Sequence, residues 1–178
     1  MRQSIGIAAI IVSSLLATTA SPALAETSPV EGREGLTRAM QGAWLPLESG
    51  LAVGGREGTP LSAKYEIDEG AFQLSVYTWK NGPSSSETFM EVIVDYSAGI
   101  VVKAEPITDD GDLAAARSQK EAMNRAKRSL AEATAAVVKA NAGYRAASAT
   151  PRLDNGQPVA EVTLVRGDDW KVVNERLD

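Results

Sequence analysis

The strongest constraint on the fold is that one pattern, a helix followed by strands, occurs twice along the chain. Apolar residues at three- and four-residue steps predict a helix, which Pro46 would kink or divide: Leu36, Met40, Ala43 or Trp44, Leu47 and Leu51. Alternating apolar and polar residues then predict strands over 64–105. After an acidic break at 109–112, a helical stretch over 113–141 precedes a second series of strands, and an S-x-x-E capping box at Ser129 favours a break into two helices there. We expect an α+β fold of two repeats, each a helix packed on a three- to four-stranded antiparallel sheet.

The boundaries of these units divide the 178 residues into four segments. We predict a signal peptide over 1–25, a flexible leader over 26–35, a first repeat over 36–107, and a long helix with the second repeat over 108–178. A unit of ~60–75 residues buries little apolar surface by itself. The two repeats are therefore expected to share buried surface.

The first 25 residues have the layout of a secretory signal peptide. Arg2 is followed by an apolar run from Ile5 to Leu16, and Ala23 to Ala25 form an A-x-A cleavage pattern. The run is shorter than the ~20 residues that a spanning helix needs. This pattern predicts a periplasmic or secreted protein that leaves the membrane once the leader is cleaved.

The composition removes most catalytic chemistry. The chain has neither cysteine nor histidine, which excludes thiolate metal sites and the commonest general base. A formal charge of -5 argues against a nucleic-acid partner, since phosphate binding needs a concentrated basic face. We predict a protein that is not an enzyme and that uses no cofactor and no metal. A carboxylate-dependent hydrolase stays as an alternative, although no Asp or Glu is flanked by an apolar run that would desolvate it.

Carboxylates are densest at residues 109–112, where Asp109, Asp110 and Asp112 surround a glycine. The spacing of a calcium-binding loop is missing there. Asp112 is better explained as the N-cap of the following helix, because a negative charge there meets the positive end of the helix dipole. A cation site in this loop stays open as the alternative.

Two short motifs predict tight turns. Asp95 and Gly99 fit a turn in which aspartate accepts hydrogen bonds from the following backbone and glycine adopts a positive φ. Asn155 and Gly156 are the residues that a two-residue β-hairpin favours.

The large aromatic side chains are the candidates for partner binding. Tyr77 and Trp79 share one face of a predicted strand, opposite Phe72, Leu74 and Val76. If the apolar face meets the helix, the two rings face outward or meet the other repeat. Trp170 joins them as a third candidate, because aromatic anchors dominate many protein interfaces.

Both halves resemble PepSY domains, which are small modules of a helix and an antiparallel sheet in exported bacterial proteins and peptidase propeptides. In the second half the resemblance rests on Ser129 to Ala136 and on Gly156 to Val165, and in the first half on Val94 to Val102, which is similar to the family's V-D-x-x-x-G-x-V turn. The second half ends without that turn. The resemblance implies a noncatalytic extracytoplasmic module, linked in some relatives to restraining a peptidase, and it brings no catalytic residues.

The leading hypothesis is therefore a module that binds a protein or peptide partner, with a peptidase as one candidate. A structural homo-oligomer is the alternative from a different class. In that case the Ala-rich face of residues 113–141 would pack against a second copy, because small side chains permit close approach, and the protein would form a homodimer.

Overall fold

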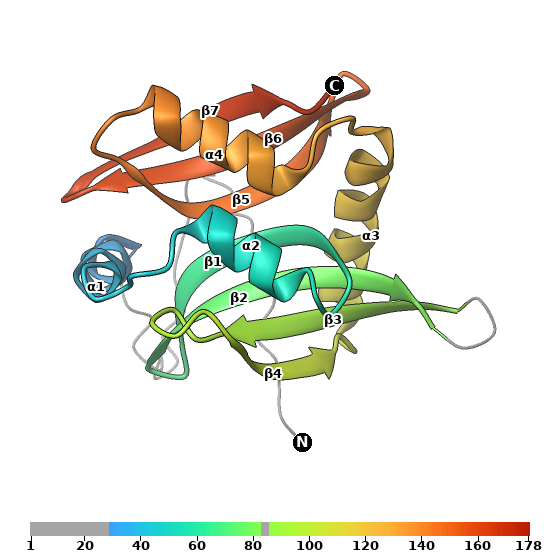
Figure 1. The fold of residues 1–178 in the computed structure, drawn as a ribbon, viewed down its shortest axis with the longest axis horizontal. Helices are drawn as coiled ribbons and strands as arrows, with labels where there is room; N and C mark the ends of the chain where they lie inside the picture. Colours follow the sequence, from blue (N-terminus) through green and yellow to red (C-terminus); the bar gives the residue numbers. More distant parts are fainter. Residues whose placement is uncertain (1–28, 83–85) are drawn as a thin grey trace, which may run out of the picture.

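The computed structural model describes residues 29–82 and 86–178, so the predicted signal peptide lies outside the described residues. The described chain forms a seven-stranded antiparallel sheet with four helices, which confirms the α+β class (Figure 1). The helices are α1 (Pro29–Met40), α2 (Leu47–Gly54), α3 (Asp110–Arg125) and α4 (Leu130–Ala140). The strands are β1 (Thr59–Asp68), β2 (Ala71–Asn81), β3 (Glu87–Val94), β4 (Val101–Pro106), β5 (Arg145–Asp154), β6 (Gln157–Arg166) and β7 (Asp169–Arg176).

The strand order β4-β3-β2-β1-β5-β6-β7 joins two meanders through their first strands. The junction is an antiparallel ladder between β1 and β5, in which Ala63 lies opposite Ala149 and Lys64 opposite Ser148. We call this ladder the central seam. One sheet therefore runs through both halves of the chain.

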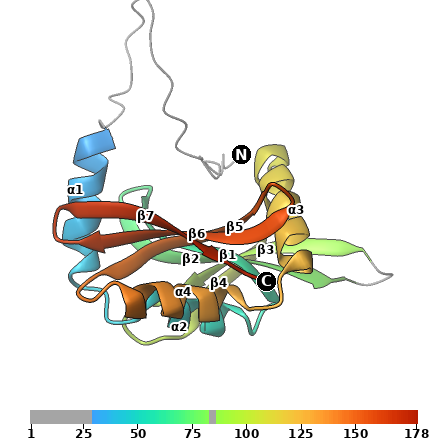
Figure 2. The same cartoon turned by 90° about the horizontal axis from the view of Figure 1, so that it is seen from above.

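The helices lie on both faces of the sheet. Figure 2 shows α2 and α4 on one face and α3 on the opposite face, while α1 stands toward the other side of the molecule from α3. The main core lies under α2 and α4 and takes side chains from both halves, among them Leu51, Val137 and Val162. A smaller cluster of Leu61, Phe89 and Ala116 lies under α3. The halves thus share buried surface.

Two glycines bring α2 directly onto the sheet. A Cβ built on Gly50 would lie 2.5 Å from a methyl carbon of Leu74, and one on Gly54 would lie 2.6 Å from Val76. At Gly54 the clash includes the Val76 Cβ at 2.7 Å, so a side chain there would push α2 away from β2, whereas at Gly50 the Leu74 side chain would have to shift.

The N-terminal part of the chain differs from the prediction. Residues 26–35 were expected to be a flexible leader, but α1 already begins at Pro29. Proline suits the first turn of a helix, where its missing N–H is not needed. The apolar periodicity starts only at Leu36, so it gave no indication of this first part. The helix predicted from Leu36 to Leu51 is divided at residues 41–46, as Pro46 indicates, and Pro46 is the N-cap of α2.

The helical stretch predicted over 113–141 forms two helices, and the predicted break before Ser129 is confirmed. The capping box that begins at Ser129 starts α4, as its S-x-x-E pattern indicates. The N-cap of α3 is Asp109 and not Asp112, since the Asp109 side chain accepts hydrogen bonds from the backbone N–H groups of Gly111 and Asp112. The helix therefore begins three residues earlier than expected, and the first carboxylate of the acidic run meets its free N–H groups.

Candidate functional site

Tyr77 lies on the sheet face opposite Leu74 and Val76, which is the face that α3 partly covers. Its side chain is 7% exposed, and its hydroxyl donates a hydrogen bond of 3.1 Å to Glu91 on β3. Burial and the neighbouring carboxylates Glu66 and Glu91 raise the pKa of Tyr77 far above its ordinary value. The Tyr77 side chain is therefore buried, and its hydroxyl donates a hydrogen bond to a residue of the same chain.

Trp79 packs under α3 with the smaller apolar cluster. The Lys120 ammonium lies 4.0 Å from the centroid of the indole ring and forms an ion pair with Glu87. Trp170 is half-buried, and its indole N–H donates a 3.1 Å hydrogen bond to Thr37 of α1. The described contacts of these rings lie within the chain, and their role as partner anchors stays a prediction.

The most exposed large apolar side chain in the described residues is Trp44, at 85%. It lies in the 41–46 segment between α1 and α2. The backbone N–H groups of Trp44 and Leu45 both donate to the carbonyl oxygen of Tyr96, at 3.2 and 2.9 Å. Segments 41–46 and 95–100 together are called the Trp44 tip below.

The backbone of this tip is fixed from two further directions. The Arg145 guanidinium on β5 donates hydrogen bonds to the carbonyls of Met40 and Ala43, at 2.6 and 2.7 Å. The Tyr65 hydroxyl on β1 donates to the carbonyl of Leu45. Burial raises the pKa of Tyr65 to about 12, so this donor keeps its proton at physiological pH. Trp44 is thus an exposed side chain on a backbone that two strands, β1 and β5, and the β3–β4 turn hold in place.

The β3–β4 turn completes the tip. Asp95 accepts hydrogen bonds of 2.7 Å from the backbone N–H groups of Ser97 and Ala98, which lower the pKa of its carboxyl. Gly99 has a φ of +67° and bonds back to the Asp95 carbonyl. Ile100, in the same turn, is 52% exposed. The turn geometry that the motif indicates therefore holds the loop whose Tyr96 carbonyl accepts the hydrogen bonds from Trp44 and Leu45.

The other predicted turn lies at the β5–β6 hairpin, away from these contacts. Asn155 and Gly156 have φ values of +50° and +80°, as a type I′ turn requires. Arg125 of α3 donates a hydrogen bond to the Gly156 carbonyl at 3.3 Å. The contacts of this turn are structural.

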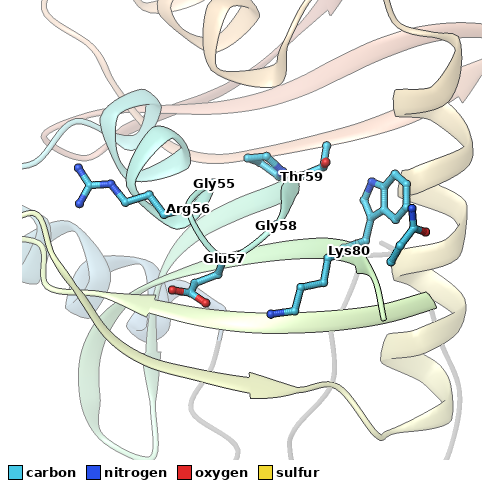
Figure 3. A pocket seen from close by; sticks show the side chains of 9 residues that line it. Gly55, Arg56, Glu57, Gly58, Thr59 and Lys80 are labelled. Atoms are coloured by element: carbon cyan, nitrogen blue, oxygen red, sulfur yellow. The ribbon is translucent and has the colours of Figure 1, made fainter. Parts of the chain in front are cut away.

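One hollow in the surface is an open cleft of about 640 Å³ between the α2–β1 connection and the end of β2 (Figure 3). Its labelled side chains do not converge on one point. Glu57 and Lys80 extend to the same side, while Arg56 points away from both. A ligand site needs a few polar groups directed at one place, and this cleft does not provide them.

A smaller hollow, of about 70 Å³, is acidic. Its carboxylates come from β1, β3, β4 and the start of α3: Glu66, Asp68, Glu91, Glu105, Asp109 and Asp112. The expectation that no carboxylate is desolvated is wrong for Glu91, because burial raises the pKa of its carboxyl. Within 29–82 and 86–178, no group of three or more acidic side chains is arranged to hold a metal ion. The volume is also far below that of the small-molecule pockets of enzymes, ~300–1,000 Å³.

The Ala-rich face that the homo-oligomer alternative uses is occupied by the chain itself. Ala116 and Ala122 of α3 and Ala133 of α4 are fully buried against the sheet. The small side chains permit close approach, as expected, but to their own strands. A second copy would have to meet a different surface.

Comparisons with known proteins give no family. No family model matches the chain, and no curated protein matches it. One solved structure, described as "a putative lipoprotein (CD1622) from Clostridium difficile 630", is similar over 75% of this chain and 87% of its own. The identity is 12% and the TM-score 0.43, so the likeness transfers neither fold nor function. None of the helices in the described part of the chain is long and apolar enough to cross a membrane.

Proposed function

We propose that this chain is an exported, noncatalytic module that binds a protein or peptide partner, with Trp44 as the anchor. The observation that carries the proposal is the 85% exposure of Trp44 on a backbone held by hydrogen bonds. Large aromatic side chains dominate the binding energy of interfaces, and a fixed backbone loses little entropy on binding.

The signal-peptide pattern supports export, and the lack of histidine and cysteine supports a noncatalytic role. The resemblance to PepSY domains supports a peptidase as the first class of partner to test. The alternative of a carboxylate-dependent hydrolase is weaker, because the acidic hollow is too small for a sugar ring and opens among hydrogen-bonded side chains.

The test is photo-crosslinking in the native envelope. A photoreactive phenylalanine analogue replaces Trp44 in one variant and Val172 in a matched control. Val172 is also an exposed apolar side chain, at 57%, but lies on β7, on the other side of the central seam. We expect position 44 to give a discrete crosslinked partner and position 172 not to capture that partner.

The captured partner is then purified and titrated against the wild-type protein and Trp44→Ala. We expect a loss of about 2 kcal/mol or more, as for an interface hot spot, which is roughly a 30-fold weaker Kd. Equal affinity for both proteins, or capture of the partner only from position 172, contradicts the proposal.

A further inference from the structure

The two edges of the sheet differ in how they are protected. β4 carries a bulge opposite Ile93 and Val94 and ends at Pro106. Both features hinder a further strand from pairing. β7 has eight residues without proline, and its register with β6 is unbroken from Asp169 to Arg176. β7 is therefore the edge strand whose regular backbone is better suited to pairing with a further strand.

The hairpin geometry shows which backbone groups of β7 point outward. Gly167 and Asp168 form a two-residue loop closed by the pair Arg166 and Asp169. The closing pair of such a hairpin is hydrogen-bonded, and hydrogen-bonded pairs alternate along the strands. The N–H and C=O groups of Trp170, Val172 and Asn174 consequently point away from β6. Among the described residues no other segment pairs with them.

We propose that β7 pairs antiparallel with β7 of a second copy, centred on Val173, and so forms a two-fold homodimer with a continuous sheet. In this register Val172 lies opposite Asn174 of the second copy, and both present outward backbone groups. Lys171 lies opposite Glu175 of the second copy, and symmetry creates this opposite-charge pair twice. Registers centred on Val172 or Asn174 do not pair Lys171 with Glu175.

The side chains of this pair are already held at the edge. The Lys171 ammonium contacts the Asn141 oxygen at 2.8 Å and lies 3.9 Å from the centroid of the Tyr144 ring. Glu175 forms a 2.8 Å ion pair with Arg128. Fixed long side chains lose less entropy when they form a cross-strand pair.

One outward-pointing carbonyl near the end of β7, that of Arg176, already accepts a hydrogen bond within the chain. Arg128 donates a 3.2 Å hydrogen bond to the carbonyl of Arg176. A carbonyl oxygen has two lone pairs, so this contact leaves capacity for the Trp170 N–H of the second copy. The four bonds between Val172 and Asn174 of the two copies are unaffected.

The experiment is sedimentation velocity over a concentration series with charge-reversed variants. We expect the wild-type protein to dimerise with increasing concentration. Lys171→Glu and Glu175→Lys each place like charges opposite one another and are expected to be monomers. Mixing these two variants restores opposite charges and is expected to give a heterodimer, and the double variant a homodimer.

A further variant removes only the edge. Val172→Pro deletes an N–H that β6 does not use, so it should abolish the dimer while far-UV circular dichroism stays native. Trp44→Ala is expected to dimerise like the wild type, which separates this proposal from the proposed function. A wild-type protein that stays monomeric at high concentration, or dimers of Val172→Pro, would overturn the proposal, as would a mixture of the charge variants that remains monomeric.

Discussion

Glu91 shows how one side chain can make stability depend on pH. It lies on β3 between the buried Met90 and Val92, with its carboxylate on the other face of the sheet beside Tyr77. Burial raises the pKa of Glu91 above its ordinary value of 4.5, and Glu66 adds to the effect, while the Tyr77 bond and Lys64 oppose it. The folded protein therefore holds this proton more tightly than the unfolded chain does.

A raised pKa means that the stabilisation from protonated Glu91 is complete below pH 4.5 and is lost as the pH rises through the folded-state value. Glu91→Gln removes the buried charge and keeps an oxygen that can accept the Tyr77 bond. We expect the variant to have a higher free energy of unfolding than the wild type at pH 7, and a difference that shrinks toward pH 4. Urea unfolding at both pH values measures it.

The control for this variant is Glu105→Gln. Glu105 lies opposite Glu91 in the sheet, but its side chain is 57% exposed and forms a surface ion pair with Lys103. Such pairs contribute ~0–1 kcal/mol, so this change should have a small effect at both pH values. If Glu91→Gln is no more stable than the wild type at pH 7, the carboxylate is not penalised by burial.

Single residues also show what sequence reasoning can find. The strand alternation correctly placed Tyr77 opposite Leu74 and Val76. It could not show that α3 covers that face, because the contact depends on a helix distant in sequence. The periodicity placed Ala43 or Trp44 on an apolar helical face, and Pro46 correctly indicated that this helix is divided, since residues preceding a proline avoid helical geometry. The periodicity could not show that Trp44 lies in the dividing segment with its side chain exposed.

At the scale of elements, helix ends follow local chemistry and are the more predictable features. The Ser129 side chain accepts a hydrogen bond from the Glu132 backbone N–H at 3.2 Å, and the Glu132 carboxylate accepts one from the Ser129 N–H at 3.0 Å. This pattern is legible within four residues of sequence. Asp109 was missed because three aspartates compete for the same helix end, and packing selects among them.

The capping box gives a prediction for α4. Ser129→Ala removes the side-chain acceptor at the N-cap and is expected to lower the free energy of unfolding by about 1 kcal/mol. Ser118→Ala, in the exposed middle of α3, is the matched control and should be neutral or slightly stabilising, because alanine favours helix interiors. Denaturant unfolding compares the two. Equal effects would show that Ser129 contributes no specific cap.

For the whole molecule, the alternation of helical and strand patterns predicted the α+β class and the presence of two halves. It did not predict that the halves join through β1 and β5, since the seam pairs residues such as Ala63 and Ala149 that lie in different halves of the chain. The periodicity of neighbouring residues does not indicate which strands pair when they lie far apart in the sequence. The Trp44 tip could not be assembled from sequence for the same reason.

The seam also predicts an order of folding. Pairings between distant residues close late, after local hairpins. Ala149 and Ala160 are both fully buried alanines in the β5–β6 hairpin, but only Ala149 also pairs across the seam. We expect each variant to lower the free energy of unfolding by roughly 1 kcal/mol. Ala149→Gly should act mainly by raising the unfolding rate, whereas Ala160→Gly should lower the refolding rate more than Ala149→Gly does. Stopped-flow tryptophan fluorescence measures both rates. Equal partitioning in the two variants would contradict a late seam.

The hydrogen bonds from Arg145 to Met40 and Ala43 have a consequence in time as well as in space. Every residue of the Trp44 tip belongs to the first half of the chain, but this clamp comes from the second. A polypeptide emerging N-terminus first, during synthesis or export, exposes Trp44 long before residue 145 arrives to hold it. Binding through a rigid tip would then require the complete chain, and a nascent or truncated molecule would bind its partner weakly.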